Sequence, residues 1–265
     1  MRGDRARSDL SSTRFADLRW VAETTSTNAD LLREAAAGAP EGIVLVADHQ
    51  TAGRGRLGRS WESPPGASLL LSVLLRPALK PSQAHLVASA VGLSAVTACQ
   101  RVAGVDPRLK WPNDLLVDLD GAERKAGGIL AESIIEHDVL EAVVVGLGLN
   151  VNWPQTIPEE LAGIATALNL VTGREVDRED LLVALLRELD GWCAQLEHEE
   201  GRDLLRATYL ARSATVGREV RVERPGGTLE GRAVDVTADG HLVVEDEAGS
   251  TIEISAGDVV HLRHG

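Results

Sequence analysis

Residues 53–61 of the chain read GRGRLGRSW, so that three arginines alternate with three glycines in a protein of net charge −13. Guanidinium groups present planar forks to carboxylate or phosphate oxygens, and glycines let a backbone approach a ligand closely. The loop therefore suits a small anionic ligand. By its spacing alone it equally suits a solvated flexible loop or an RGG-like contact to nucleic acid.

A second pattern lies in the stretch GLGLN, where Gly146, Gly148 and Asn150 share one face of a predicted strand because side chains alternate with a period of two. Glycines weaken strands, so two on one face indicate the close approach of a backbone or a flat ligand. A bulge or tight helix packing is the alternative. The stretch KAGGILAE (residues 125–132) carries a similar pair, and Lys125 at its start could reach a phosphate.

The stretch KWPND (residues 110–114) places a cation, an aromatic ring, a proline, an amide and a carboxylate together. These groups could bind phosphate, bind a metal or orient a substrate, although a turn with a buried tryptophan would read the same way. The histidines show no metal-ligand spacing, and we expect His261 and His264 at the surface. No GxSxG segment supplies a nucleophile, which lowers the expectation of covalent catalysis.

The composition limits the classes of partner. Forty acidic residues against 27 basic ones give a pI near 5.0, which argues against an extended basic surface for nucleic acid or anionic lipid. Cys99 and Cys193 are far apart, so we expect reduced, buried thiols in a cytoplasmic protein, with a disulfide as the minor alternative. No run of about 20 apolar residues predicts a membrane span.

The elements that must position these motifs alternate between helices and strands. We expect a short helix after residues 26–28, strands over 42–50 and 68–76, a core helix over 81–102, strand-like runs over 110–121, 125–134 and 139–152, and helices over 178–197 and 202–212. After about residue 213 four short alternating strands predict a small barrel. The first 18 residues are expected to be disordered.

Five segments in this order closely resemble biotin–protein ligase: STN (26–28), HQTAGRGRLGRSW (49–61), KWPNDLLV (110–117), KAGGILAE (125–132) and GLGLNVN (146–152). The resemblance extends from about residue 20 to 212, and the tail resembles the family's SH3-like C-terminal domain. It implies an α/β (α+β) fold, with a mixed-sheet catalytic domain like those of class II aminoacyl-tRNA synthetases and biotin–lipoate ligases over residues 19–213. An SH3-like β-barrel would then occupy residues 214–265.

The resemblance also implies an activity. Members of the family form biotinyl-5′-AMP from biotin and ATP with Mg²⁺, and transfer biotin to a lysine of the biotin carboxyl carrier protein domain of an acetyl-CoA or acyl-CoA carboxylase. We expect a cytoplasmic monomer or weak homodimer without a DNA or membrane partner. The N-terminal segment is too short for the helix-turn-helix module of some bacterial members, so no repressor function is expected.

The family's functional residues fall on matching positions of this chain. Those implied for biotin are Ser26, Thr27, Asn28, Gln50, Gly53, Arg54, Gly55, Arg56, Trp61, Lys125, Gly128 and Gly146. Those implied for the nucleotide are Arg56, Arg59, Trp61, Lys110, Asn113, Lys125 and Asn150, with Asn150 reading adenine. The catalytic set is Lys125, Arg56, Lys110 and Asp114, with Lys125 on the reacting oxygens and Asp114 as base. Asn113 and Asp114 are the expected Mg²⁺ ligands.

Two other functions compete with this interpretation. A lipoate–protein or octanoate–protein ligase would share the fold and the carrier-lysine chemistry, but the arginine loop followed by KWPND favours biotin. A nucleic-acid-binding module would use the loop and the terminal barrel. The pI near 5.0, one tyrosine and one phenylalanine count against it, because they leave few stacking platforms.

Overall fold

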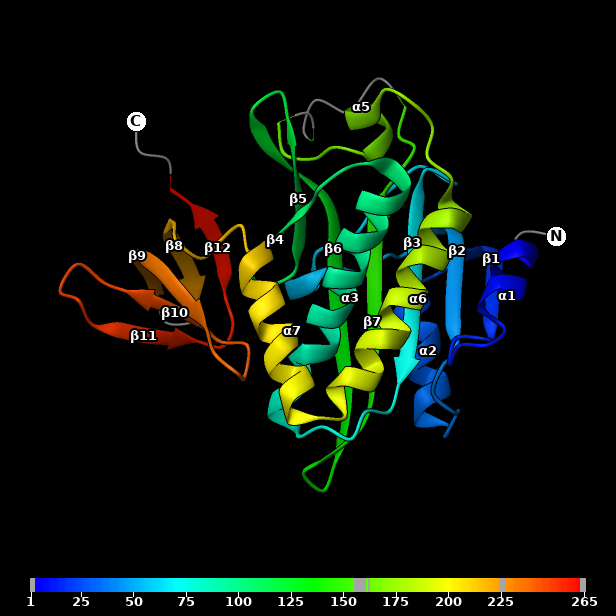
Figure 1. Ribbon diagram of the computed structural model, residues 1–265, viewed down its shortest axis with the longest axis horizontal. Coiled ribbons are helices and arrows are strands. Elements are labelled where there is room, and N and C mark those ends of the chain that lie inside the picture. Colours follow the sequence, from blue (N-terminus) through cyan, green and yellow to red (C-terminus); the bar gives the residue numbers. More distant parts are fainter. Residues whose placement is uncertain (1–2, 155–160, 162, 225–226, 263–265) are drawn as a thin grey trace.

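The computed structural model describes residues 3–154, 161, 163–224 and 227–262. Its larger part is a mixed seven-stranded sheet in the order β1-β2-β3-β7-β6-β5-β4 (Figure 1). The strands are β1 (Leu18–Thr24), β2 (Val44–Gln50), β3 (Ser68–Leu75), β4 (Arg108–Lys110), β5 (Asp114–Leu119), β6 (Ala122–Glu136) and β7 (Val139–Asn150). The pair β1 and β2 is parallel and the other pairs are antiparallel. The mixed sheet expected from the sequence is confirmed.

Helices cover both faces of this sheet. On one face lie α3 (His85–Ala98), α6 (Arg178–Leu196) and α7 (Glu199–Arg212) (Figure 1). The main core packs there, and it takes Leu71 and Val73 from β3. On the other face, α2 (Thr27–Ala36) packs on a smaller core that contains Leu74. Successive side chains of β3 therefore point to opposite faces of the sheet. One face is covered by α3, α6 and α7, and the N-terminus of α2 lies on the other.

The long apolar segment Pro81–Ala103 is a core helix, as predicted. Its length and its mean hydropathy of 1.4 would suffice to cross a membrane, yet 67% of that stretch is buried in the fold. It combines a 3-10 turn (Pro81–Gln83), α3 and a π-helical end (Cys99–Ala103). Cys99 and Cys193 are buried free thiols, as expected, and burial raises the pKa of each to about 12.

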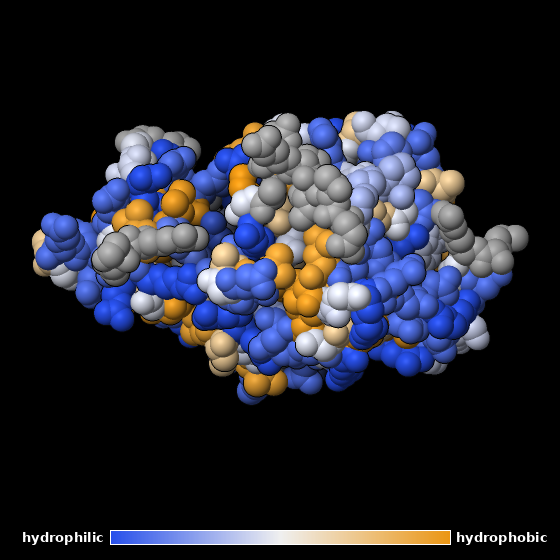
Figure 2. All heavy atoms as spheres, turned by 90° about the horizontal axis from the view of Figure 1, so that it is seen from above, coloured by the Kyte–Doolittle hydropathy of each residue, from blue (hydrophilic) through white to orange (hydrophobic). Residues whose placement is uncertain are grey.

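The C-terminal part is a five-stranded antiparallel sheet in the order β11-β10-β9-β8-β12, the arrangement expected of the SH3-like domain. Its strands are β8 (Glu219–Arg224), β9 (Gly227–Val236), β10 (Leu242–Glu245), β11 (Thr251–Ile254) and β12 (Asp258–His261). The sequence did not predict β12. Residues 225–226 and His264 lie outside the described residues. Figure 2 shows a mostly hydrophilic face with small hydrophobic patches.

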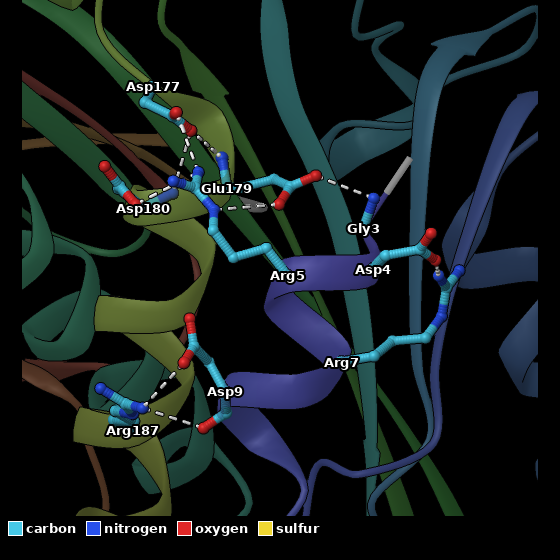
Figure 3. Close-up of polar contacts among 9 residues, drawn as sticks. All are labelled: Gly3, Asp4, Arg5, Arg7, Asp9, Asp177, Glu179, Asp180 and Arg187. Atoms are coloured by element: carbon cyan, nitrogen blue, oxygen red, sulfur yellow. Dashed lines mark hydrogen bonds and ion pairs between the residues drawn. The ribbon is translucent and has the colours of Figure 1, made fainter. Parts of the chain in front are cut away.

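The expectation of a disordered start is wrong for the described part of that segment. Residues Asp4–Leu10 form helix α1, and Ala6 and Leu10 are fully buried. Figure 3 shows its polar contacts with the start of α6: Gly3 N donates to Glu179 Oε1 at 2.8 Å, and Arg5 pairs with Asp177 at 2.9 Å. These contacts lie 170 or more residues apart in sequence, so no local pattern could reveal them. The short helix α5 (Leu168–Thr172) was also not predicted.

Candidate active site

A cavity of about 300 Å³ lies on the α2 face of the large sheet and is closed at one side by the C-terminal sheet. The structure brings most of the predicted site residues to its walls. They are Ser26, Thr27, Asn28, Gln50, Arg54, Gly55, Arg56, Arg59, Trp61, Lys110, Asn113, Asp114, Lys125, Gly128 and Gly146. Segments more than 100 residues apart thus form one site, which the order of motifs alone could not locate.

Two predicted residues lie outside this lining. Asn150 is 2% exposed, and its Nδ2 donates to the carbonyl of Thr166 at 3.0 Å while Ser68 Oγ donates to its Oδ1 at 3.5 Å. An amide engaged in this way does not fit the predicted reading of adenine. Gly53 has a spacing role instead, since a Cβ there would come within 2.4 Å of the carbonyl oxygen of Trp61.

Neutral polar side chains line one end of the cavity. Ser26 caps α2 by accepting a hydrogen bond from Ala29 N at 3.4 Å. The backbone N of Thr27 and its hydroxyl reach Gln50 Oε1 at 2.8 and 3.0 Å. Ser72, which the sequence analysis did not select, is fully buried and contacts both Thr27 and Asn28. This end therefore offers a fixed set of donors and acceptors.

The glycine face is contacted by side chains of the protein itself. Gly128 and Gly148 stand opposite each other on β6 and β7, and a Cβ on Gly148 would lie 2.4 Å from the Trp61 indole. A Cβ on Gly146 would lie 2.3 Å from Asn28 Oδ1. The bare strand thus receives the protein's own Trp61 ring and Asn28 amide, so the close approach at Gly146 and Gly148 is made by protein side chains.

The opposite end of the cavity carries the charged groups. Strands β4 and β5 form a hairpin in which Lys110 and Asp114 are register partners. Lys125 Nζ lies 2.6 Å from Asp114 Oδ1 and 5.4 Å from the centroid of Trp61. Burial lowers the pKa of Lys110 below its ordinary value. Loss of solvent therefore makes the Lys110 ammonium more costly until an anion binds.

The arginine loop runs between this end and the C-terminal sheet. It closes on itself through Trp61 N to Gly53 O at 2.9 Å. Arg56 Nη1 lies 3.5 Å from Asn113 Oδ1 and from Gly257 O, and burial lowers the pKa of its guanidinium.

The loop is also held by an ion pair between Arg59 and Asp258. Glu223, Asp258, Val259 and Val260 of the C-terminal sheet line the cavity, and the sequence analysis missed all four. No motif marks them, because only the packing of the two sheets brings them to the site.

The predicted metal ligands do not fit a protein-held metal site. Among the described residues no group of three or more His, Cys, Asp or Glu side chains could hold an ion. Asp114 already pairs with the ammonium of Lys125, and Asn113 uses its oxygen and nitrogen on Arg56 and the carbonyl of Ile129. A divalent cation would need most of its oxygen ligands from a bound substrate.

The arrangement as a whole suits a particular kind of ligand. Lys110, Lys125 and Arg56 converge on one end, while Thr27 and Gln50 provide neutral polar groups at the other. A molecule with a polar, uncharged ring and an anionic tail would meet complementary groups at both ends. Several cations in a partly buried site can also bring two anions together.

Comparisons with known proteins support this description. Residues 20–150 match the Biotin/lipoate A/B protein ligase family, and residues 215–262 match the Biotin protein ligase C terminal domain. The chain is 43% identical to Biotin--[acetyl-CoA-carboxylase] ligase of Mycobacterium tuberculosis over 92% of this chain and 88% of that protein. It is 32% identical to Bifunctional ligase/repressor BirA of Bacillus subtilis over 80% of this chain and 64% of that protein.

A solved structure has the same architecture. The biotin protein ligase from Aquifex aeolicus in complex with biotin and ATP superimposes with a TM-score of 0.78 at 30% identity. The match covers 94% of this chain and 100% of that chain. The likeness therefore includes both sheets.

Proposed function

The chain belongs to the biotin protein ligase family and is a ligase, and from this premise we propose that it activates biotin with ATP and transfers it to a carrier protein. The first product would be biotinyl-5′-AMP, with release of pyrophosphate. The second step would place the biotinyl group on a lysine of a biotin carboxyl carrier protein domain, from an acetyl-CoA or acyl-CoA carboxylase. One observation carries the proposal: Lys110, Lys125 and Arg56 meet at one end of a cavity whose other end is lined by neutral polar side chains.

The first step joins two anions. A carboxylate oxygen of biotin attacks the α-phosphorus of ATP, a new O–P bond forms, and the bond to the β-phosphate oxygen breaks. Lys125 is positioned by Asp114 at 2.6 Å and is the cation we assign to the reacting oxygens. Arg56 and Lys110 would neutralise the remaining phosphate charge. Fixed cations in a partly desolvated site favour such a step because they need little reorganisation.

The orientation of biotin follows from the two ends of the cavity. The ureido ring would lie against Thr27, Asn28 and Gln50, where neutral donors and acceptors are gathered. The valerate carboxylate would then point toward Lys125. Trp61 lies between these ends and would form the wall along the ligand, as its packing on Gly148 indicates.

The second step needs less from the protein. The amine of the carrier lysine attacks the acyl carbon of the mixed anhydride, AMP leaves with the bonding electrons, and the amine loses a proton. Asp114, which lies beside Lys125, is our candidate to accept that proton. Mg²⁺ would enter with the phosphates of ATP as part of the substrate. The cytoplasmic location, the monomeric or weakly dimeric state and the absence of repressor function stay predictions.

The experiment that tests the proposal is exchange of labelled pyrophosphate into ATP with biotin, lipoate or octanoate as the acid. Exchange that depends on biotin, followed by biotin transfer to a purified carrier domain, would support the proposal. Exchange with lipoate or octanoate but not with biotin would contradict it and would favour the alternative ligase. Absence of exchange with all three acids would reject the adenylation step itself.

A further inference from the structure

The side-chain amide of Asn28 is held by three partners at the polar end of the cavity. Its Nδ2 donates to the carbonyl of Leu130 at 3.1 Å and to Glu132 Oε2 at 2.9 Å. Its Oδ1 accepts a hydrogen bond from Ser72 Oγ at 2.6 Å. Asn28 is 4% exposed and Ser72 is fully buried, so water does not compete for these bonds. The amide is therefore fixed in position.

The partners also fix which atom of the amide faces which way. A flipped Asn28 would turn its oxygen toward the Leu130 carbonyl and the Glu132 carboxylate, which are both acceptors. Ser72 supports the same orientation. Its hydroxyl has one proton, and because Asn28 Oδ1 cannot donate, that proton is used there. Thr27 Oγ1 lies 2.7 Å from Ser72 Oγ and 3.0 Å from Gln50 Oε1, so the single hydroxyl proton of Thr27 is shared between these two contacts.

The sheet leaves space for this arrangement. Ser72 is the register partner of Gly146 across β3 and β7. A Cβ on Gly146 would lie 2.3 Å from Asn28 Oδ1 and 3.3 Å from Ser72 Oγ. Asn28 Oδ1 thus lies over bare strand at the cavity wall. An amide oxygen has two lone pairs, and Ser72 occupies one of them, which leaves one for a ligand.

Gln50 provides the opposite polarity. Its Oε1 accepts from the backbone N of Thr27 at 2.8 Å, and a backbone N–H can only donate, so the Gln50 amide is fixed as well. Within the described part of the chain its Nε2 has no hydrogen-bond partner. The two amides together offer one acceptor and one donor to the cavity.

We propose that Ser72 and Glu132 are positioning residues that hold the Asn28 oxygen as the acceptor for an N–H group of the bound acid. The inference rests on the proposed function and names its specificity determinant. A cyclic urea offers N–H donors beside a carbonyl acceptor, which matches Asn28 and Gln50. A lipoyl or octanoyl chain offers no N–H donor, so it would leave the buried Asn28 oxygen with an unused lone pair.

The test compares Ser72→Ala with Ser68→Ala in the full-length chain. Both serines are fully buried, and both belong to the same face of β3, but the hydroxyl of Ser68 contacts Asn150 and Trp153 away from the cavity. Biotin binding is measured by calorimetry, and KM values for biotin and ATP by pyrophosphate exchange. We expect Ser72→Ala to raise the Kd and KM for biotin about ten- to hundredfold. The KM for ATP and kcat should stay within about twofold.

Two further variants separate positioning from general destabilisation. Glu132→Gln keeps an oxygen that can accept from Asn28 and should bind biotin within about threefold of the unmodified protein, whereas Glu132→Leu should bind about tenfold more weakly. In an Asn28→Ala background, Ser72→Ala should have almost no further effect, because the two residues act through one interaction. Equal effects of Ser72→Ala and Ser68→Ala, or full additivity with Asn28→Ala, would overturn the inference. Failure of the unmodified chain to bind biotin would instead reject the proposed function.

Discussion

At the scale of single residues, Lys125 is the most direct test of the chemistry. Its ammonium lies between Asp114 and the Trp61 ring at the charged end of the cavity. We expect Lys125→Ala to reduce biotin-dependent pyrophosphate exchange by at least about a hundredfold, since a cation aimed at the reacting oxygens is lost. Biotin binding, which depends on the polar end, should stay measurable by calorimetry.

The matched control for this prediction is Lys80→Ala. Lys80 is exposed at the start of the 3-10 turn before α3, away from the cavity lining. Its replacement should leave exchange unchanged. If Lys125→Ala catalyses pyrophosphate exchange as fast as Lys80→Ala does, Lys125 is not a catalytic residue.

Gly148 offers a second residue-scale prediction, which concerns the packing of Trp61. An alanine Cβ at this position would lie 2.4 Å from the indole ring and would push it off the strand. We expect Gly148→Ala to lower kcat/KM in the exchange assay about tenfold or more, and to cost about 1–3 kcal/mol of unfolding free energy through overpacking. Chemical denaturation measures the second quantity.

Gly191→Ala is the control for that change. It lies in helix α6, where a Cβ would meet no atom within 4 Å, so it should raise the free energy of unfolding by about 0.5–1 kcal/mol without affecting exchange. Combining Gly148→Ala with Trp61→Phe should recover part of the lost stability, because the smaller ring relieves the clash. If the free energy of unfolding does not recover in the double variant, the glycine at position 148 is not needed to make room for the Trp61 ring.

At the scale of elements, the arginine loop depends on its tie to strand β12. The Arg59 side chain is 68% exposed and its partner Asp258 23%, and an exposed ion pair contributes only about 0.2–1 kcal/mol. We therefore expect Asp258→Asn to increase tryptic cleavage at the loop arginines by up to about fivefold in the ligand-free protein. Bound biotinyl-5′-AMP should remove the difference, since it would hold the loop through Arg56.

The control for the loop is Asp235→Asn. Asp235 pairs with Arg206 between β9 and α7, away from the cavity lining. If Asp235→Asn accelerates cleavage in the loop as much as Asp258→Asn does, then general loosening of the C-terminal domain, rather than the tie to Arg59, sets the cleavage rate.

The same scale shows what the sequence could predict. Strands β2 and β3, helix α3 and helix α6 were predicted because each carries a long apolar run or periodic pattern of its own. Strand β1 was missed because it is an edge strand with little burial, and β12 because its sequence DVVH does not alternate between apolar and polar residues. Helix α1 was missed because its buried residues Ala6 and Leu10 and its ion pairs with α6 depend on distant segments, which no local pattern records (Figure 3).

The residues of the candidate site also fall into two groups, those that the sequence could predict and those that it could not. Lys110, Lys125 and the arginine loop belong to contiguous motifs and could be predicted. Ser72 and Asp258 are single polar residues in ordinary strands. Asp258 reaches the cavity through domain packing, and Ser72 acts on it only through its contacts with Thr27 and Asn28. Asn150 belongs to the motif GLGLN, but its amide donates to the Thr166 carbonyl. The motif therefore predicted that this segment belongs to the site, but it did not predict the role of each of its residues.

At the scale of the whole molecule, the C-terminal domain is fastened to the turn that carries the charged end of the site. Trp111 N donates to Thr215 Oγ1 at 3.0 Å, and Trp111 Nε1 donates to the carbonyl of Gly240 at 2.9 Å. Lys110 and Asp114 flank this turn. The C-terminal domain therefore helps to hold the catalytic hairpin as well as lining the cavity.

His261 lies at this junction, and its prediction as a surface residue is wrong. Its side chain is 12% exposed and contacts Thr215 and Arg218, each at 3.2 Å. Arg218 in turn binds Glu123 through two bonds of 2.6 Å. Burial, together with the nearby cations Lys110 and Arg218, lowers the pKa of His261 from 6.5 to about 4, despite Glu123. The neutral ring accepts a hydrogen bond from Arg218 at Nδ1 and donates from Nε2 to Thr215.

This junction predicts a specific pH dependence of stability. Between pH 6.5 and about 4 the unfolded chain protonates His261 while the folded protein keeps it neutral, so the free energy of unfolding falls as the pH is lowered. From these two values the loss attributable to His261 is about 2 kcal/mol between pH 7.5 and 5. We expect His261→Gln to have a lower free energy of unfolding than the unmodified protein at pH 7.5. Between pH 7.5 and 5 its free energy of unfolding should fall by about 2 kcal/mol less, as measured by urea unfolding at both pH values. Replacing the exposed His198 by glutamine should leave the full pH dependence in place. If His261→Gln and His198→Gln show the same dependence, the titrating group is not at the domain junction.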